Sequence, residues 1–208
     1  MDDRIKGTPW EIITAFSEEL AEINRIRTDS GMTDFVARLF VRTLFSIFDG
    51  YAFYLKQQAL AGAAGAGITF SKAEMEVIRE LREVQTATGV DIRPKIIPTR
   101  ENLLFALKAF GRVRGSAPPL VANSLPAAFG VAAEVRNRIT HPKKTADFLV
   151  SQTERDAVAQ LMIWWKEVMD WARRAELTYI EHIKQQIHDS TQEMIRRIEE
   201  EGGKLPKA

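Results

Sequence analysis

The chain has no cysteine, which excludes disulfide bonds, thiolate metal sites and a cysteine nucleophile. It has only three histidines, so a histidine-rich metal centre is not expected, and we predict neither a metal nor another cofactor. Glycine and proline are scarce, with 12 and 8 among 208 residues, which argues against a disordered or fibrous chain. Apolar residues make up 45% of the sequence, enough for the core of one ordinary domain.

Long uninterrupted apolar runs are also absent. The most apolar stretch, residues 35–60, is broken by charged side chains, whereas a membrane-spanning helix carries few charges near its centre. These charges belong to Arg38, Arg42, Asp49 and Lys56. The first ten residues contain no apolar core of signal-peptide length. We therefore expect a cytoplasmic protein that makes no contact with a membrane.

Helical signals run through almost the whole chain, so we expect an all-α fold, an up-down helical bundle around one core. Residues 33–60 are apolar on most of their helical circumference, which is typical of a central buried helix. Polar residues at helix starts predict the other helices, and three of them belong to capping boxes. The expected caps are Thr8, Ser71, Thr99, Ser124 and Ser151.

The expected ends of these helices follow from glycine and proline. The helix after Ser71 is predicted to run to about Gly89, and no strand of useful length is expected anywhere. The helix that begins at Thr99 is predicted to end near Phe110, before a loop rich in glycine and proline. The next helix is predicted to end at Thr140, because a following proline disfavours helical geometry.

The last helix has no breaker between Ser151 and Gly202, so it could approach about 50 residues, against a usual length of about 11–12. We divide the chain into a helical domain at 1–180 and a helical C-terminal extension at 181–208 with a disordered tip. The distal half of the helix is expected to bend back or to pack on a second chain. The aromatic residues of its first half are expected in the core or a dimer interface, and the histidines of its second half in solvent. They are Trp164, Trp165 and Trp171, and His182 and His188.

The net charge of +1 conceals an uneven distribution. Residues 93–144 contain ten basic and two acidic side chains, a net charge of +8, which leaves −7 for the rest of the chain. A basic region concentrates partners that carry phosphate groups. The alternative is an ordinary surface on which these side chains are spread over several faces.

The segment with the most chemical information is residues 136–142, RNRITHP. His141 is expected at a helix C-terminus, where the helix dipole favours imidazolium and poises a proton donor near neutral pH. Asn137 lies about 40° away around the helix and could orient the imidazole ring. Arg136 can hold a phosphate through two hydrogen bonds, but it projects about 140° from His141. These groups either form a site in a shared groove or merely cap the helix.

The pattern Arg136-Asn137-x-x-x-His141 resembles the HEPN superfamily of all-α proteins. In that family an arginine, often followed by a polar residue, precedes a histidine by about four to six residues near the end of the penultimate helix. The apolar residues 35–49 are similar to the long early helix of these domains, and the helix that contains residues 161–165 follows the motif in the same order. The resemblance covers about residues 10–180.

The resemblance implies a metal-independent endoribonuclease whose active site lies at a homodimer interface. Attack by the 2′-hydroxyl leaves a 2′,3′-cyclic phosphate and a 5′-hydroxyl end. His141 would then act as acid and base, Arg136 would stabilise the phosphorane, and Asn137 would position the histidine or the phosphate. The same resemblance implies a toxin or an anti-phage effector, with RNA as substrate and an antitoxin protein as a partner.

Pairing of two chains is also expected from the residues themselves. One chain offers one plausible catalytic histidine, whereas in-line phosphoryl transfer gains from groups on both sides of the phosphorus. Around the motif, basic residues could follow an RNA backbone without reading its sequence, although a solvated surface explains them equally well. These residues are Arg138, Lys143 and Lys144.

Two further charged residues are secondary site candidates. Arg42 and Asp49 are seven residues apart and share one helix face, from which they could orient Arg136. The alternative is a solvated stripe that includes Arg38 and Lys56.

The leading alternative to a nuclease is a non-catalytic HEPN-like module that binds RNA, nucleotide or a protein partner through the same basic groove. A third interpretation is a purely structural dimer. Cleavage in the presence of a chelator distinguishes the first from the other two.

Overall fold

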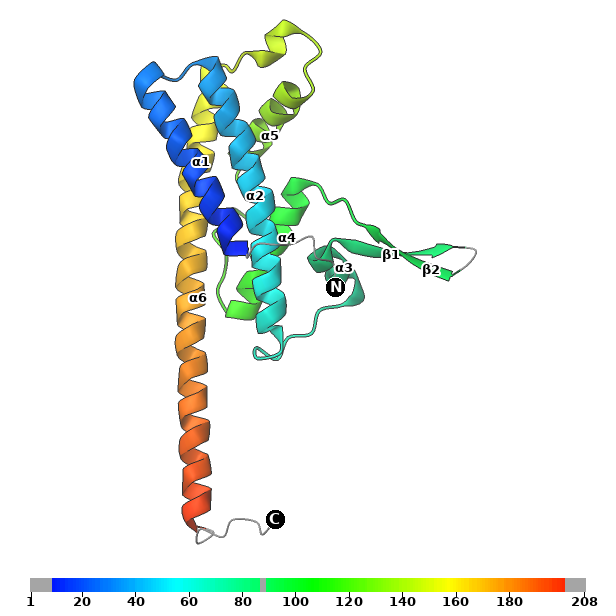
Figure 1. Ribbon diagram of the computed structural model, residues 1–208, viewed down its shortest axis with the longest axis vertical. Helices are drawn as coiled ribbons and strands as arrows, with labels where there is room; N and C mark the ends of the chain where they lie inside the picture. The colour runs from blue at the N-terminus through cyan, green and yellow to red at the C-terminus, as the bar shows by residue number, and fades with distance from the viewer. Residues whose placement is uncertain (1–8, 87–88, 201–208) are drawn as a thin grey trace.

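The computed structural model describes residues 9–86 and 89–200. It is mostly helical, which confirms the predicted all-α class apart from one small hairpin. The elements are α1 (Pro9–Ser30), α2 (Asp34–Ala63), α3 (Lys72–Arg79), β1 (Leu81–Thr86), β2 (Gly89–Pro94), α4 (Thr99–Arg114), α5 (Ala127–Thr140), the short 3₁₀ helix η1 (Thr145–Phe148) and α6 (Gln152–Glu200). Figure 1 shows their arrangement. The expected cap Thr8 and the expected disordered tip lie outside the described residues.

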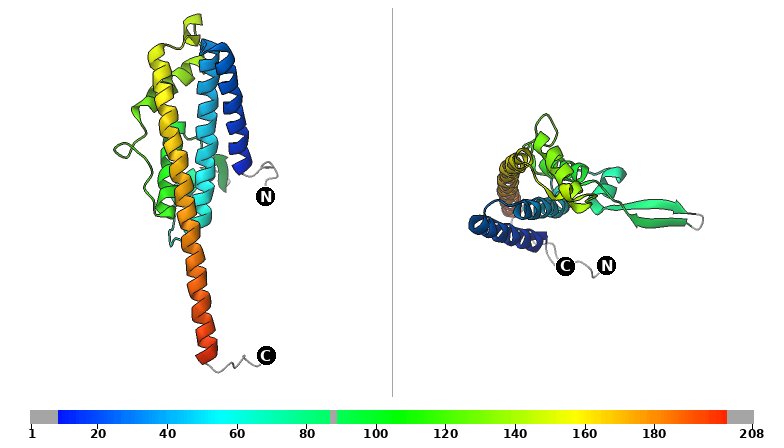
Figure 2. Two further views of the ribbon diagram at one scale, coloured as in Figure 1. Left: turned by 90° about the vertical axis from the view of Figure 1, so that its left-hand side faces the viewer. Right: turned by 90° about the horizontal axis from the view of Figure 1, so that it is seen from above.

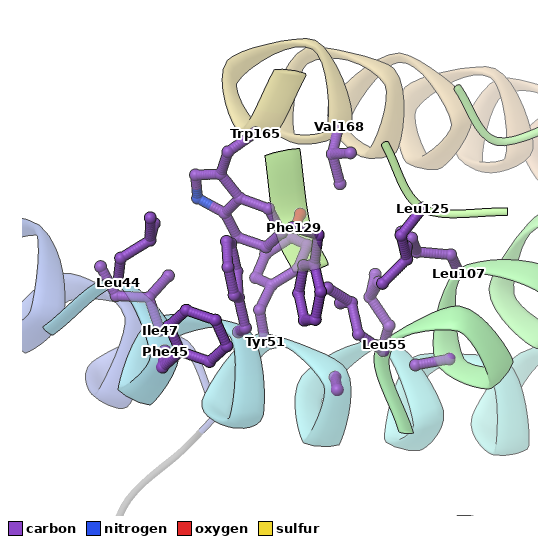
Figure 3. Packing of buried hydrophobic residues seen from close by; sticks show 14 of the residues in the cluster. Leu44, Phe45, Ile47, Tyr51, Leu55, Leu107, Leu125, Phe129, Trp165 and Val168 are labelled. Carbon is purple, nitrogen blue, oxygen red and sulfur yellow. The ribbon is translucent and has the colours of Figure 1, made fainter. Parts of the chain in front are cut away.

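The central helix of the bundle is α2, as its apolar composition predicts. The hydroxyl of Thr33 accepts a hydrogen bond from the backbone N–H of Val36 at 3.3 Å and caps it. The ring of Phe48 stacks on Phe129 of α5 at a centroid distance of 5.5 Å and meets Trp165 of α6 edge-on at 4.8 Å. Figure 3 shows Phe129 and Trp165 among the buried side chains that pack between the helices. The cluster holds α5, and therefore the predicted motif, against α2.

The last helix, α6, has 49 residues, close to the predicted length. Its predicted capping box is confirmed, because the Ser151 hydroxyl accepts from the Glu154 N–H at 3.3 Å and the Glu154 carboxylate accepts from the Ser151 N–H at 2.8 Å. The three tryptophans of its first half are buried in the core, as expected: Trp164, Trp165 and Trp171.

The distal half of α6 continues straight past the ends of the other helices (Figures 1 and 2). The prediction that it bends back is therefore wrong, while its contact with a second chain stays a prediction. His182 and His188 on this half are exposed, as expected. Within residues 9–86 and 89–200, none of the helices combines the length and the apolar character needed to span a membrane.

The segment that follows the second capping box differs from the prediction. Helix α3 ends at Arg79, and residues 81–94 form an antiparallel β-hairpin in place of a longer helix and a connector. Glu80 ends α3 with a left-handed backbone, at a φ of 55°. The reason is a tertiary contact, because the buried Lys56 ammonium of α2 binds the Glu80 carboxylate at 2.5 Å. That contact fixes where the chain leaves the helix.

Helix α4 is about one turn longer than predicted, because Phe110 is followed by residues that still pack on the core. The Arg114 guanidinium is almost completely buried and donates two hydrogen bonds to the Glu176 carboxylate of α6, at 2.7 and 3.3 Å. Gly115 then ends the helix with a left-handed φ of 63°, which glycine adopts without steric cost.

Helix α5 begins two residues later than predicted. Its first residue is Ala127, and the preceding Pro126 stands in the N-cap position, so the expected cap Ser124 lies in the loop. The predicted C-terminal end is confirmed: the helix ends at Thr140, two residues before Pro142.

Candidate functional site

The motif residues lie on the last turn of α5 and on the residue that follows it. Arg136 is partly buried, and its guanidinium donates a hydrogen bond to Oδ1 of Asn137 at 3.1 Å. The His141 side chain is exposed, and its backbone N–H donates to the Asn137 carbonyl oxygen at 3.0 Å. The Asn137 amide thus contacts the arginine, and among the described residues no side chain makes a hydrogen bond with the imidazole. The expected orientation of the ring by Asn137 is not seen within one chain.

Arg42 fixes the position of this turn. Its Nη2 atom donates a hydrogen bond across the bundle to the carbonyl oxygen of Ile139, at 2.7 Å. That carbonyl belongs to the last turn of α5, where carbonyl oxygens have no partner within the helix and the dipole attracts a cation. Arg42 therefore holds the end of α5 to α2. This contact places Arg42, one of the two secondary site candidates, next to the motif. Its hydrogen bond goes to the backbone of α5 and not to Arg136.

Arg138 holds the loop that follows the motif. Its guanidinium donates to both carboxylate oxygens of Glu154, at 2.8 and 3.0 Å, and to the carbonyl oxygens of Asp147 and Leu149, at 3.3 and 2.8 Å. The hydrogen bonds from Arg138 hold the pKa of the Glu154 carboxyl below its ordinary value. These bonds tie α5, η1 and α6 together. The geometry favours a structural role for Arg138 over the predicted contact with RNA.

Lys143 and Lys144 lie on the exposed side of the same loop. Their backbone N–H groups donate to one carboxylate oxygen of Asp147, at 2.7 and 3.0 Å, and this lowers the pKa of that carboxyl. Both side chains remain exposed beside His141. They are therefore placed where a phosphate backbone at the motif could reach them.

The other secondary site candidate is Asp49, whose carboxylate lies on α2. Loss of hydration raises the pKa of Asp49 above its ordinary value, while a hydrogen bond with the Thr99 side chain and the positive charge of Arg136 act in the opposite direction. The predicted role of Asp49 in orienting Arg136 stays a prediction, because no hydrogen bond or ion pair joins the two side chains among the described residues. Thr99 was predicted only as a helix cap, and its role beside Asp49 carries no signal in the sequence.

The expected solvated stripe on α2 is wrong for Lys56, which is fully buried. Its ammonium binds the Asn102 side-chain oxygen at 2.8 Å and the Val77 carbonyl oxygen at 3.2 Å, in addition to Glu80. The three bonds satisfy its three donors. The Lys56 end of the stripe thus faces α3 and α4, whereas Arg38 and Arg42 donate to the carbonyl oxygens of Phe148 and Ile139.

Ion pairs account for half of the basic side chains in residues 93–144. Five of the ten contact acidic residues within 4 Å, and all five of these acidic residues lie outside that stretch. The pairs are Arg93–Asp91, Lys95–Glu76, Arg112–Glu74, Arg114–Glu176 and Arg138–Glu154. In the part of the chain that is described, Arg136, Lys143 and Lys144 have no ion pair. The basic side chains that are free to bind an anion thus include those at the exposed end of α5.

The arrangement combines one guanidinium, one imidazole and two lysines on an exposed helix end. The described ranges contain no group of three or more His, Cys, Asp or Glu side chains with metal-binding geometry. The chemistry that these residues can supply is anion binding and proton transfer. No protein-family model, curated protein or solved structure matches this chain.

Proposed function

We propose that the protein is a HEPN-type, metal-independent endoribonuclease whose active site forms between two copies of the chain. The observation that carries the proposal is the fixed end of α5. Arg42 holds it from one side at 2.7 Å and Arg138 ties down the loop after it, so that the turn bearing Arg136 and the following residue His141 are held in place. A rigid turn that offers a proton-transfer group and a phosphate-binding group meets the requirements of phosphodiester cleavage.

In the proposed reaction, the RNA 2′-hydroxyl loses its proton to His141, and its oxygen forms a new bond to the adjacent phosphorus. The bond from phosphorus to the 5′-oxygen breaks, and that oxygen takes a proton from His141 of the partner subunit. The Arg136 guanidinium stabilises the additional negative charge on the phosphorane. The products are a 2′,3′-cyclic phosphate and a 5′-hydroxyl, with no oxidant, metal or other reactant consumed.

A second copy is needed for two physical reasons. One chain supplies one histidine at the motif, and His141 is exposed, so water surrounds it until another surface covers it. The exposed lysines Lys143 and Lys144 extend the positive surface on which RNA would lie. A toxin or an anti-phage effector, held in check by an antitoxin, belongs to the same proposal.

One observation favours the alternative of a non-catalytic module that binds RNA, nucleotide or protein. The Asn137 side chain contacts Arg136, and the His141 ring has no hydrogen-bond partner among the described residues that would fix its tautomer. In such a module Arg136 would still bind a phosphate. The two candidates therefore differ in turnover and not in binding.

The test compares the purified protein with single variants on total RNA in the presence of EDTA. His141→Ala removes the proposed acid and base, and His188→Ala is the matched control, because it removes another exposed histidine far along α6. We expect cleavage by the wild type and by His188→Ala, and a loss of at least about 100-fold for His141→Ala. RNA binding without cleavage by the wild type would favour the binding module.

A further inference from the structure

The distal half of α6 carries an apolar stripe with the spacing of a coiled coil. Ile180, Ile187 and Met194 are seven residues apart, Leu177 lies three residues before the first, and Ile198 four residues after the last. These five residues occupy a/d positions of a heptad repeat, which bring side chains onto one seam between two helices, and the two remaining seam positions are Lys184 and Thr191. All five side chains are exposed, by 38% to 63% of their surface. We call these five residues the α6 stripe.

Within residues 9–86 and 89–200, no other element covers the stripe. The Tyr179 hydroxyl donates a hydrogen bond to the Gly62 carbonyl oxygen at 3.3 Å, and the side-chain hydrogen bonds of the residues after it, 180–200, all stay within α6. Figure 2 shows this part of the helix standing alone beyond the bundle. A single helix of about 20 residues is marginally stable in water unless its apolar face is packed. We therefore expect the exposed stripe to pack against a partner helix.

The polar residues inside the stripe restrict the orientation of that partner. Lys184 occupies a seam position and is bonded to Glu181 of its own helix at 2.8 Å. In a parallel pair in register, Lys184 would lie opposite the same residue of the partner, which costs stability. In an antiparallel pair it lies beside an apolar residue, and its aliphatic stem can cover that residue while its ammonium stays in water.

A cavity on the bundle extends the stripe in the other direction along α6. It has a volume of about 420 Å³ and is lined by Tyr54, Met169, Arg173 and Leu177, among others. Met169 precedes Ile180 by 11 residues, which is three turns, so the two lie within about 20° of the same helix face. Leu177 belongs to both the stripe and the cavity, and the two form one apolar track.

The shape of the chain favours one orientation of a second copy on this track. The cavity lies on the bundle, so a second copy in parallel orientation would bring its own whole bundle against the first one. An antiparallel second copy brings only its bare distal α6. That helix is about 32 Å long between Leu177 and Ile198, enough to follow the partner's stripe to its cavity.

We propose that the α6 stripe is a self-association surface, on which the distal α6 of a second copy packs antiparallel and reaches the cavity beside Leu177. The contact is isologous, so each chain gives and receives the same surface. It goes beyond the proposed nuclease dimer, because the stripe lies at the end of the molecule far from α5 (Figure 1). Motif pairing and stripe pairing are separate contacts of the same chain.

The test measures the mass of the full chain in solution by light scattering. Ile187→Glu places a charge in the stripe, and Gln186→Glu places the same charge on the neighbouring residue outside it. We expect Ile187→Glu and Met194→Glu to reduce the mass at least twofold, and Gln186→Glu to leave it unchanged. A monomeric wild type, including one that gains mass only when another protein is added, would overturn the proposal, as would equal effects of Ile187→Glu and Gln186→Glu.

The orientation is tested with a spin label on Glu199→Cys, which is unambiguous because the chain has no other cysteine. Antiparallel pairing predicts a distance of about 30–60 Å between the two labels, depending on register, and parallel pairing a distance below about 20 Å. The short distance would contradict the proposal.

RNA cleavage by Ile187→Glu separates the two proposals. A loss of mass with cleavage retained supports stripe pairing and leaves the nuclease proposal intact. Absent cleavage in every variant refutes the nuclease proposal alone.

Discussion

Replacement of Arg42 by alanine tests whether α2 positions the motif. The change removes a charged hydrogen bond of 2.7 Å to the carbonyl of Ile139 and a cation at the negative end of α5. Hydrogen bonds to charged groups contribute about 1.5–3 kcal/mol, but Arg42 is partly exposed and water can replace it, so we expect a loss of about 1 kcal/mol. For a chain of this size, that lowers the melting temperature by about 2–4 °C.

The effect on catalysis is expected to exceed the effect on stability. Once Ile139 is released, the turn that carries His141 can move, and a displacement of about 1 Å can cost on the order of 100-fold in rate. The assays are thermal unfolding and RNA cleavage, with Arg174→Ala on the exposed side of α6 as the matched control. An unchanged melting temperature, or an equal loss of cleavage by Arg174→Ala, would refute the positioning role of Arg42.

Three further substitutions probe the support of the site, each by chemical denaturation. Gly62→Ala is expected to cost about 1–3 kcal/mol in spite of better helix propensity, because its Cβ would lie 2.1 Å from Nη1 of the buried Arg114; a stabilised variant would contradict this packing. Lys56→Met is expected to cost about 1–3 kcal/mol by leaving buried oxygens without a donor, and a neutral result would contradict that network. Glu154→Gln should cost about 1–3 kcal/mol at neutral pH. The folded-state pKa of Glu154 is lowered by Arg138, so this difference is fully present above the unfolded pKa and shrinks as pH falls below about 4; a pH-independent difference would contradict it.

The features that the sequence predicts correctly are those set by neighbouring residues. A serine followed by glutamate three positions later closes a capping box whatever the rest of the chain does, as at Ser71 and Ser151. Pro142 ends α5 because its ring acts on the residue before it. The long α6 follows in the same way from the absence of any breaker.

The features that the sequence does not predict depend on contacts across the fold. The hairpin replaces a helix because buried Lys56 draws Glu80 into a left-handed turn, and these two residues are 24 positions apart. The sequence identifies Arg42 as a charged residue on a helix face, but it does not reveal its hydrogen-bond partner, which is a backbone carbonyl 97 positions away. For the motif itself, residue types and spacing identify Arg136 and His141, whereas the contact of Asn137 with Arg136 depends on side-chain rotamers.

The chemical identity of the RNA ends produced in EDTA tests the central proposal most directly. We predict that mass spectrometry of the products finds 2′,3′-cyclic phosphates and 5′-hydroxyls, and that an RNA of the same sequence methylated at every 2′-oxygen stays intact. Intact RNA in both samples, or products with 3′-hydroxyl and 5′-phosphate ends, would contradict the attack by the 2′-hydroxyl on which the role of His141 depends.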